Sequence, residues 1–300
     1  MKRAKLANFL IGTPTFVWLV VFYALPVLIM FLLAFKPVDA NGGIGDGWTL
    51  RTVMELRNPS YPSIIWRTAW QGALSTALCI MMAVPISYQL ARMAPRWRNL
   101  SLMLIIVPFW TNFLIRIYAW KVFLHPHGAF KTALVWLGLA EPSTQLLYNE
   151  WAVLAVMVYT YLPYAVLPIY AVAEKFDFSL LDAAKDLGAS SFYAFRRVFL
   201  PGIANGIWTA LMVVLIPALG AYLIPSLVGG PTSELLGDKI AQRVFVDRNL
   251  PHASALSALL MLAVFLPLLA GLVLRRLREA RQSTEAERQA APAAAKEVRP

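Results

Sequence analysis

The chain has 300 residues, of which 59% are hydrophobic and only 14% are charged. A soluble protein of this size carries about a quarter charged residues, so the composition excludes an ordinary water-soluble domain. The net charge of +11 gathers beside apolar segments rather than in a basic stripe with interleaved aromatic residues, which argues against a nucleic-acid-binding protein.

Six apolar runs are long enough to cross a bilayer, which takes about 20 residues for a hydrocarbon core of about 30 Å. The first run follows a basic start, but it is too long for a signal peptide and no small-residue cleavage site closes it, so we expect it to be retained. The sequence therefore predicts an all-α integral membrane protein with six transmembrane helices. The runs cover about residues 9–35, 67–91, 100–123, 150–172, 203–225 and 253–274.

The distribution of charge predicts the orientation of this six-helix domain, residues 9–274. Six spans place both termini on one side, together with loops 92–99 and 173–202. The four segments on that side, including 1–8 and 275–300, hold 17 of the 27 basic residues but only 8 of the 16 acidic ones. Because basic loops stay in the cytoplasm, we expect both termini there, in a multi-pass inner (plasma) membrane protein. The basic tail 275–300 is expected to be disordered.

Cysteine and histidine usage argues against a disulfide or a metal site. The single cysteine, Cys79, lies inside the second apolar run and is expected to be a small buried residue. His125 and His127 flank a proline in the outer segment 124–149, and the remaining histidine is His252. Two histidines fall short of the three or four ligands that a metal usually needs, so we expect no bound metal.

The segment 175–201 separates two of the apolar runs and reads as a helix, a glycine break and a second helix. Ser179 is placed to cap a first helix over 180–187, with Asp182 completing a capping-box pattern. Gly188 permits the left-handed backbone that ends a helix, and Ser190 or Ser191 can cap the next one. Residues of apolar character recur at helical spacing in both helices, namely Leu180, Leu181, Ala184 and Leu187, then Phe192, Phe195, Val198 and Phe199.

A helix over 180–187 would be only about 12 Å long and would not be stable by itself. It needs a groove, either on this chain or on a partner. Two interpretations of the residues remain open at this point: a docking site for another protein, and an amphipathic connector lying on the lipid surface.

A resemblance carried by the spacing of the segment favours the docking site. The pattern Asp182-Ala183-Ala184-x3-Gly188-x9-Val198-x-Leu200-Pro201 resembles the cytoplasmic signature of bacterial ABC importer permeases. Every element matches, except that Asp182 stands where that family usually has Glu. The resemblance implies a coupling helix that docks on a separate ATPase, through Asp182, Ala183, Ala184, Lys185, Leu187, Gly188, Leu200 and Pro201.

Three further stretches are similar to spermidine/putrescine importer permeases: 107–120, 161–170 and 224–231. The resemblance runs from about 9 to 274 and implies the type I ABC importer permease fold. It also implies partners: a second homologous permease subunit, a cytoplasmic ATPase dimer and an external or periplasmic substrate-binding protein. A polyamine is therefore the expected solute, with amino-acid derivatives, opines and other small solutes as alternatives.

One departure bears on the solute. Polyamine-type relatives often carry an acidic residue in the stretch equivalent to 220–227, where this chain has Ala221 and Ser226. Aromatic faces could contact a cation instead. Arg116 is the one charge away from the ends of a predicted span, and it either serves the pathway or extends to the outer interface. The candidate pathway residues are Trp110, Asn112, Arg116, Tyr118, Tyr159, Tyr161 and Tyr164.

Enzymatic and ion-driven alternatives lack their motifs. The sequence has no P-loop, no His-Glu-x-x-His and no Gly-x-Ser-x-Gly, so we expect a non-catalytic subunit without a cofactor, with ATP bound by a partner. A secondary transporter usually shows internal repeats and intramembrane carboxylates, and neither is seen. Pro163, Pro168 and Pro217 could mark either broken helices at a pathway or ordinary kinks.

Overall fold

The computed structural model describes residues 13–39, 42–266, 269, 271 and 273. Within this part of the chain every named element is a helix, and the only β pairing is an isolated bridge between Val38 and Ile44. The all-helical class expected from the sequence is confirmed for the described residues. The predicted N-terminus 1–8 and tail 275–300 lie outside them.

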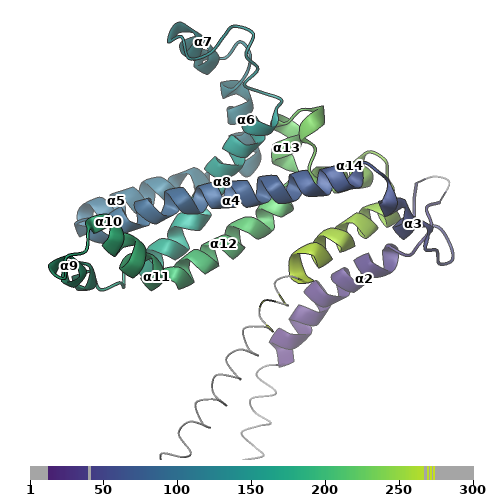
Figure 1. Ribbon diagram of the computed structural model, residues 1–300. Coiled ribbons are helices and arrows are strands. Elements are labelled where there is room, and N and C mark those ends of the chain that lie inside the picture. The colour runs from purple at the N-terminus through teal and green to yellow at the C-terminus, as the bar shows by residue number, and fades with distance from the viewer. Residues whose placement is uncertain (1–12, 40–41, 267–268, 270, 272, 274–300) are drawn as a thin grey trace, which may run out of the picture.

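The centre of the fold is a bundle of three helices, α4 (Tyr61–Arg92), α8 (Glu150–Ala173) and α12 (Ala204–Leu219) (Figure 1). Small residues allow these helices to approach closely, as is common in membrane bundles. A Cβ added to Gly206 would lie 3.0 Å from the carbonyl oxygen of Pro168. Cys79 is fully buried in the same core, as expected.

Three helices are long and apolar enough to cross a membrane: Thr13–Leu33, α4 and α8. The first contains η1 (Val20–Ala24) and α2 (Leu25–Leu33). Two bent pairs raise the number to five if each pair is one span, and a further apolar helix, Leu250–Leu266, is shorter. The expected number of six is therefore not reached among the described residues and stays a prediction.

The third predicted span is broken rather than straight. The helices α5 (Pro95–Ile106) and η3 (Val107–Trp110) meet α6 (Phe113–Phe123) at a bend of 94°. Asn112 starts α6 by accepting a hydrogen bond from the backbone N–H of Leu114 at 2.8 Å. A cap of this kind lets a new helix begin in a new direction.

The prolines of the bundle do not break their helices. Pro163 and Pro168 lie inside the single helix α8, and Pro217 lies inside α12. The fifth predicted span nevertheless ends at Leu219, and α13 (Leu223–Val228) follows as a separate short helix. These prolines therefore do not mark breaks inside their helices, and the choice between a kink at a pathway and an ordinary kink stays a prediction.

A second layer lies beside the bundle. Figure 1 shows α2 next to the helix Leu250–Leu266, joined to the bundle by α3 (Arg51–Met54), η2 (Glu55–Arg57) and α14 (Leu236–Phe245). The two helices share an apolar cavity lined by residues of both, including Phe31, Phe35, Ala255, Ala258 and Leu262. No residue of η1 or α2 is buried, so this surface is free for lipid or another chain.

The two ends of the bundle carry different segments. At one end lie α9 (Ser179–Asp186), α10 (Ser191–Ala194), η4 (Phe195–Phe199) and α11 (Leu200–Gly202) (Figure 1). Toward the other end lie α13, α14 and α3, while α7 (Ala129–Trp136) stands away from the bundle beyond α6 (Figure 1). The helix–glycine–helix segment is thus far from the outer loops.

Candidate coupling site and transport pathway

We call residues 175–201 the coupling segment. Its first helix begins at Ser179, one residue earlier than the sequence suggested. Ser179 lies inside α9, and its backbone N–H donates to the Asp177 carboxylate at 3.0 Å. Hydrogen bonds from the Ser179 side chain and backbone hold the pKa of Asp177 below its usual value. The prediction that Ser179 caps the helix is therefore wrong, because Asp177 supplies the acceptor. Asp182 instead pairs with Lys185 at 3.1 Å.

The end of this helix follows the prediction. Gly188 has φ +88°, a left-handed conformation that glycine adopts without strain. Its N–H donates to the carbonyl of Lys185 at 2.8 Å, and the N–H of Ala189 donates to the carbonyl of Ala184 at 3.0 Å. These are the two bonds of a Schellman motif. No atom lies within 4 Å of a Cβ added at Gly188, so conformation rather than space requires glycine there.

The apolar residues of α9 face two different surroundings. Leu181 is buried against this chain and only 4% exposed, whereas Leu180 is 50% and Leu187 90% exposed. Ala184 is half-buried and Ala183 is exposed. The groove that a short helix needs is therefore partly on this chain, and the remaining apolar surface is uncovered.

The second arm of the segment is anchored more deeply. Ser190 caps α10 by accepting from the N–H of Tyr193 at 3.2 Å, as one of the two expected serines. The π-helical turn η4 buries Phe199 completely; such turns recur at functional sites. Phe192 stays 73% exposed, so it does not share the buried face predicted for it. Leu200 is half-buried and Pro201 exposed in α11, before the start of α12.

An aromatic cluster joins both arms to the end of α4. We call it the aromatic joint, and it consists of Tyr88, Phe176, Phe178, Phe195 and Phe199. The Tyr88 ring lies edge-on to Phe195 and Phe199, with centroids 5.4 and 5.0 Å away. Arg92 donates a 2.6 Å hydrogen bond to the Tyr88 hydroxyl and lies over the ring of Phe178. Edge-on aromatic contacts add about 0.5–1.5 kcal/mol each beyond burial.

Sequence reasoning missed Tyr88, Phe176 and Phe178 as parts of this site. Their only signal was the density of phenylalanine between 176 and 199, because nothing local places the end of α4 beside it. The joint connects the residues before α9 and the turn η4 to the end of α4.

Some of the candidate pathway residues are brought together. Tyr164 lies edge-on to Phe109 with ring centroids 4.9 Å apart, and the guanidinium of Arg116 lies 5.1 Å from the centroid of the same Phe109 ring. Tyr161 is 6.4 Å from Tyr164 and donates its hydroxyl to the carbonyl of Pro217 at 3.2 Å. These residues join the broken third span to α8 and α12.

The other candidates lie elsewhere. Trp110 and Tyr118 are 78% and 47% exposed, and Asn112 is occupied as the cap of α6. Tyr159 packs edge-on against Trp120 with centroids 5.1 Å apart. The seven predicted residues therefore do not form one site.

A cavity of about 180 Å³ opens beside the aromatic group. Tyr161 lines it with Phe113 and the turn between α12 and α13. The carbonyl oxygens of Gly220 and Ala221 in this turn pack against Gly237, where an added Cβ would lie 2.7 and 2.6 Å from them. The complete lining is Phe113, Tyr161, Pro217, Gly220, Ala221, Tyr222, Leu223 and Ile224.

The contact at Gly237 brings carboxylates to this region that the sequence did not place there. Asp238 follows Gly237 directly, and burial together with the charge of Glu234 raises the pKa of Asp238 to about 6. Lys239 pairs with Glu234 at 3.2 Å. Asp238 does not line the cavity beside Tyr161, and nothing in its spacing indicated that its helix contacts the turn after α12.

His125 and His127 are linked to each other by a hydrogen bond. Nδ1 of His125 accepts the backbone N–H of His127 at 3.2 Å. Within the described ranges, no three His, Cys, Asp or Glu residues are grouped to hold a metal ion.

Known proteins resemble this chain in sequence and in fold. Residues 78–279 match the family described as "binding-protein-dependent transport system inner membrane component". The spermidine/putrescine transport system permease protein PotB of Haemophilus influenzae is 36% identical over 242 residues, 81% of this chain and 85% of that protein. PotB of Escherichia coli is 34% identical over 252 residues, 84% of this chain and 92% of that protein.

A solved structure gives the same fold. It is a chain of a bacterial ABC transporter involved in the import of the acidic polysaccharide alginate, with a TM-score of 0.69 and 18% identity. The match covers 92% of this chain and 96% of that one. Sequence, geometry and fold agree, and the chain belongs to the family of binding-protein-dependent transport system inner membrane components.

Proposed function

We propose that this chain is the permease subunit of an ATP-driven importer that carries a polyamine, such as spermidine or putrescine, across the inner membrane. The observation that carries the proposal is the coupling segment. A short helix with a Schellman end leaves Leu187 90% exposed at one end of the bundle. Leu180 is a second exposed apolar side chain of the same helix, and an exposed apolar patch is typical of a protein interaction site.

In the proposed mechanism, movement of the ATPase is transmitted to the membrane-spanning helices. ATP binding closes the ATPase dimer, whose surface holds α9 through Leu180 and Leu187. Because the aromatic joint fixes the segment to α4, and α11 leads directly into α12, closure displaces α4 and α12 together. The pathway then opens outward and receives the solute, while hydrolysis stays on the partner chain.

The proposed assembly follows from the family. It contains a second homologous permease, two ATPase copies and an external binding protein. Six spans of a type I permease, with the sixth at 253–274, would place both termini and α9 in the cytoplasm, as the distribution of basic residues indicates. The uncovered surface of η1 and α2 is available to the second permease.

The names of the PotB relatives support a polyamine as the solute. The cavity beside Tyr161 offers aromatic faces, which attract cations. The absence of an acidic residue at Ala221 and Ser226 favours the second candidate, a smaller cation derived from an amino acid, which needs fewer carboxylates.

Co-purification and uptake test the proposal together. The tagged chain is extracted from native membranes in mild detergent, and its companions are identified by mass spectrometry. We expect an ATPase and a second permease, and we expect uptake of radiolabelled spermidine and putrescine that requires this chain. Recovery of the chain alone after gentle extraction would contradict the importer, and uptake of neither polyamine would contradict only the solute.

A further inference from the structure

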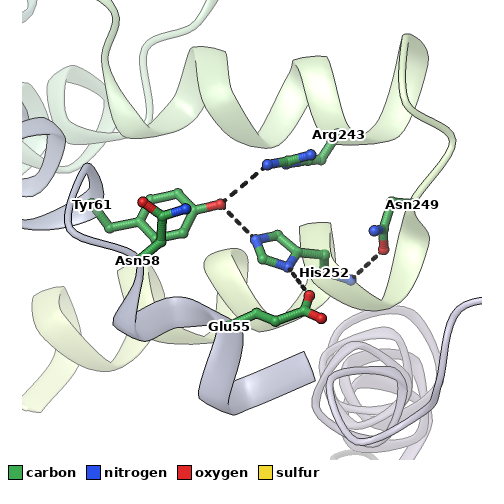
Figure 2. A pocket seen from close by; sticks show the side chains of 6 residues that line it. All are labelled: Glu55, Asn58, Tyr61, Arg243, Asn249 and His252. Atoms are coloured by element: carbon green, nitrogen blue, oxygen red, sulfur yellow. Dashed lines mark hydrogen bonds and ion pairs between the residues drawn. The ribbon is translucent and has the colours of Figure 1, made fainter. Parts of the chain in front are cut away.

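A polar cavity of about 340 Å³ lies away from the coupling segment, where four segments of the chain meet. They are η2, the first turn of α4, the end of α14 and the first turn of the helix Leu250–Leu266 (Figure 2). Neither the coupling segment nor the aromatic pathway group uses it. The lining residues are Glu55, Asn58, Tyr61, Arg243, Asn249 and His252.

A chain of hydrogen bonds crosses one wall of this cavity. The Tyr61 hydroxyl lies 2.6 Å from Nε2 of His252 and 3.4 Å from Nη2 of Arg243. On the other side of the imidazole ring, Nδ1 lies 3.3 Å from Oε2 of Glu55. Figure 2 shows these side chains converging from the four segments. Tyr61 and His252 are 3% and 4% exposed.

The chemistry of these groups fixes the position of each proton. A guanidinium can only donate, so the Tyr61 oxygen accepts from Arg243. The Tyr61 hydrogen must then go to Nε2 of His252, which is therefore the unprotonated nitrogen. Nδ1 carries the ring hydrogen and donates it to Glu55. Every donor and acceptor in this series of hydrogen bonds is satisfied only while the imidazole is neutral.

A second proton on His252 would break this order. It would place a hydrogen on Nε2, facing the Tyr61 hydroxyl, and the Tyr61 hydrogen would lose its acceptor in a buried position, which is costly. The charges around the ring are those of Arg243, Glu55 and Asp247, and Asp247 pairs with Arg243 at 2.8 Å. Arg51 faces the other carboxylate oxygen of Glu55 at 3.6 Å.

The balance of these charges favours the neutral ring. Burial and, next, the charge of Arg243 hold the pKa of His252 below its usual value, against the opposing effect of Glu55. His252 precedes the apolar run 253–274, so it titrates from the aqueous side. A lowered histidine pKa means that the contact is complete above about pH 6.5 and is lost as the pH falls through the folded-state pKa.

We propose that Tyr61 and His252 form a latch that positions the outer end of α4 for transport and that opens when His252 is protonated. The latch holds the first residue of α4, and the same uninterrupted helix reaches Tyr88 and Arg92 in the aromatic joint. At ~1.5 Å per residue, its 32 residues span about 48 Å. One continuous helix, which contains Pro85, thus links the latch to the coupling segment.

The test substitutes His252→Gln in the full chain, within its native complex. Glutamine can still accept from Tyr61 and donate to Glu55 but does not titrate. The matched control is His127→Gln, since His127 is an exposed histidine of another outer segment. The uptake measurement rests on the proposed function and uses radiolabelled spermidine and putrescine at about pH 7.5 and about pH 5, on either side of the ordinary histidine pKa.

We expect acidification to reduce uptake by wild type and by the control roughly three-fold or more, as titration of one positioning group allows. The His252→Gln variant should lose much less, and Tyr61→Phe should be reduced at both pH values because it removes the bridging hydroxyl. Identical pH profiles for wild type and His252→Gln would overturn the latch.

A second measurement separates the latch from the importer. Thermal unfolding of the purified chain should show a midpoint that falls further on acidification in wild type than in His252→Gln. If wild type takes up neither polyamine, the proposed solute is wrong and this unfolding difference decides the latch alone. Equal shifts of the midpoint in both proteins would then reject it.

Discussion

The ring of Phe176 lies directly against Gly202. A Cβ added at Gly202 would stand 2.4 Å from Cε2 and 2.8 Å from Cδ2 of that ring. Phe176 precedes the first helix of the coupling segment, and Gly202 ends the second, so this contact closes the segment into a loop. The same ring is edge-on to Phe199, with centroids 5.2 Å apart, which extends the contact into the aromatic joint.

This contact predicts that Gly202→Ala disturbs coupling. The added methyl group has no room unless Phe176 rotates, and overpacking of this kind costs typically about 1–3 kcal/mol. We expect the chain to reach the membrane while solute uptake falls, since the joint no longer holds both arms. Gly43→Ala is the control, because no atom lies within 4 Å of its added Cβ. Normal uptake by Gly202→Ala would show that the joint tolerates rearrangement.

Gly188 tests conformation instead of space. Its φ of +88° suits glycine, and L-residues pay roughly 1–2 kcal/mol in a left-handed conformation, with asparagine the best tolerated. We expect Gly188→Ala to weaken binding of the ATPase more than Gly188→Asn, although nothing crowds either side chain. The measurement is the amount of ATPase that co-purifies with equal amounts of each variant. Equal recovery from both variants would contradict a strict need for this backbone geometry.

Variants of Leu187 and Leu181 distinguish a role in docking the ATPase from a role in folding. Leu187 is 90% exposed, so Leu187→Asp should leave the thermal stability of the chain unchanged and abolish ATPase recovery. Leu181 is only 4% exposed, so Leu181→Ala should destabilise by up to about 2–5 kcal/mol, as buried leucine truncations do. Both variants are compared by thermal unfolding and by co-purification. Retained ATPase binding by Leu187→Asp would move the docking surface elsewhere on the segment.

Local patterns predicted the parts of the fold that depend on local physics. The left-handed end at Gly188 and the cap at Ser190 follow from backbone preference and a short side-chain bond, and both are confirmed. The cap of α9 was assigned to Ser179 because serine is a good cap. Asp177, two residues earlier, instead accepts the hydrogen bond from the backbone N–H at the start of the helix. A pattern in a single sequence cannot tell which of two nearby acceptors caps the helix.

Contacts between distant segments could not be read from the sequence. Apolar composition alone predicted one straight helix over 100–123, whereas the cap at Asn112 turns it by 94°. Tyr61 and His252 are 191 positions apart, and each looks unremarkable in its own segment. Their pairing depends on how four helix ends meet, which hydropathy does not encode.

Asp238 allows the latch to be distinguished from general acid sensitivity. Its folded-state pKa is raised from 3.8 to about 6, chiefly by burial, so the stability it contributes is present at low pH and is lost as the pH rises through the folded value. His252 acts in the opposite direction.

We therefore expect Asp238→Asn to remove a gain in thermal stability on acidification from about pH 6 to about pH 4, measured by unfolding of the purified chain. The acid-dependent difference between wild type and His252→Gln should persist in the Asp238→Asn background, because the two groups titrate in separate surroundings. Loss of that difference would show that one coupled titration, rather than the latch, governs the response to pH.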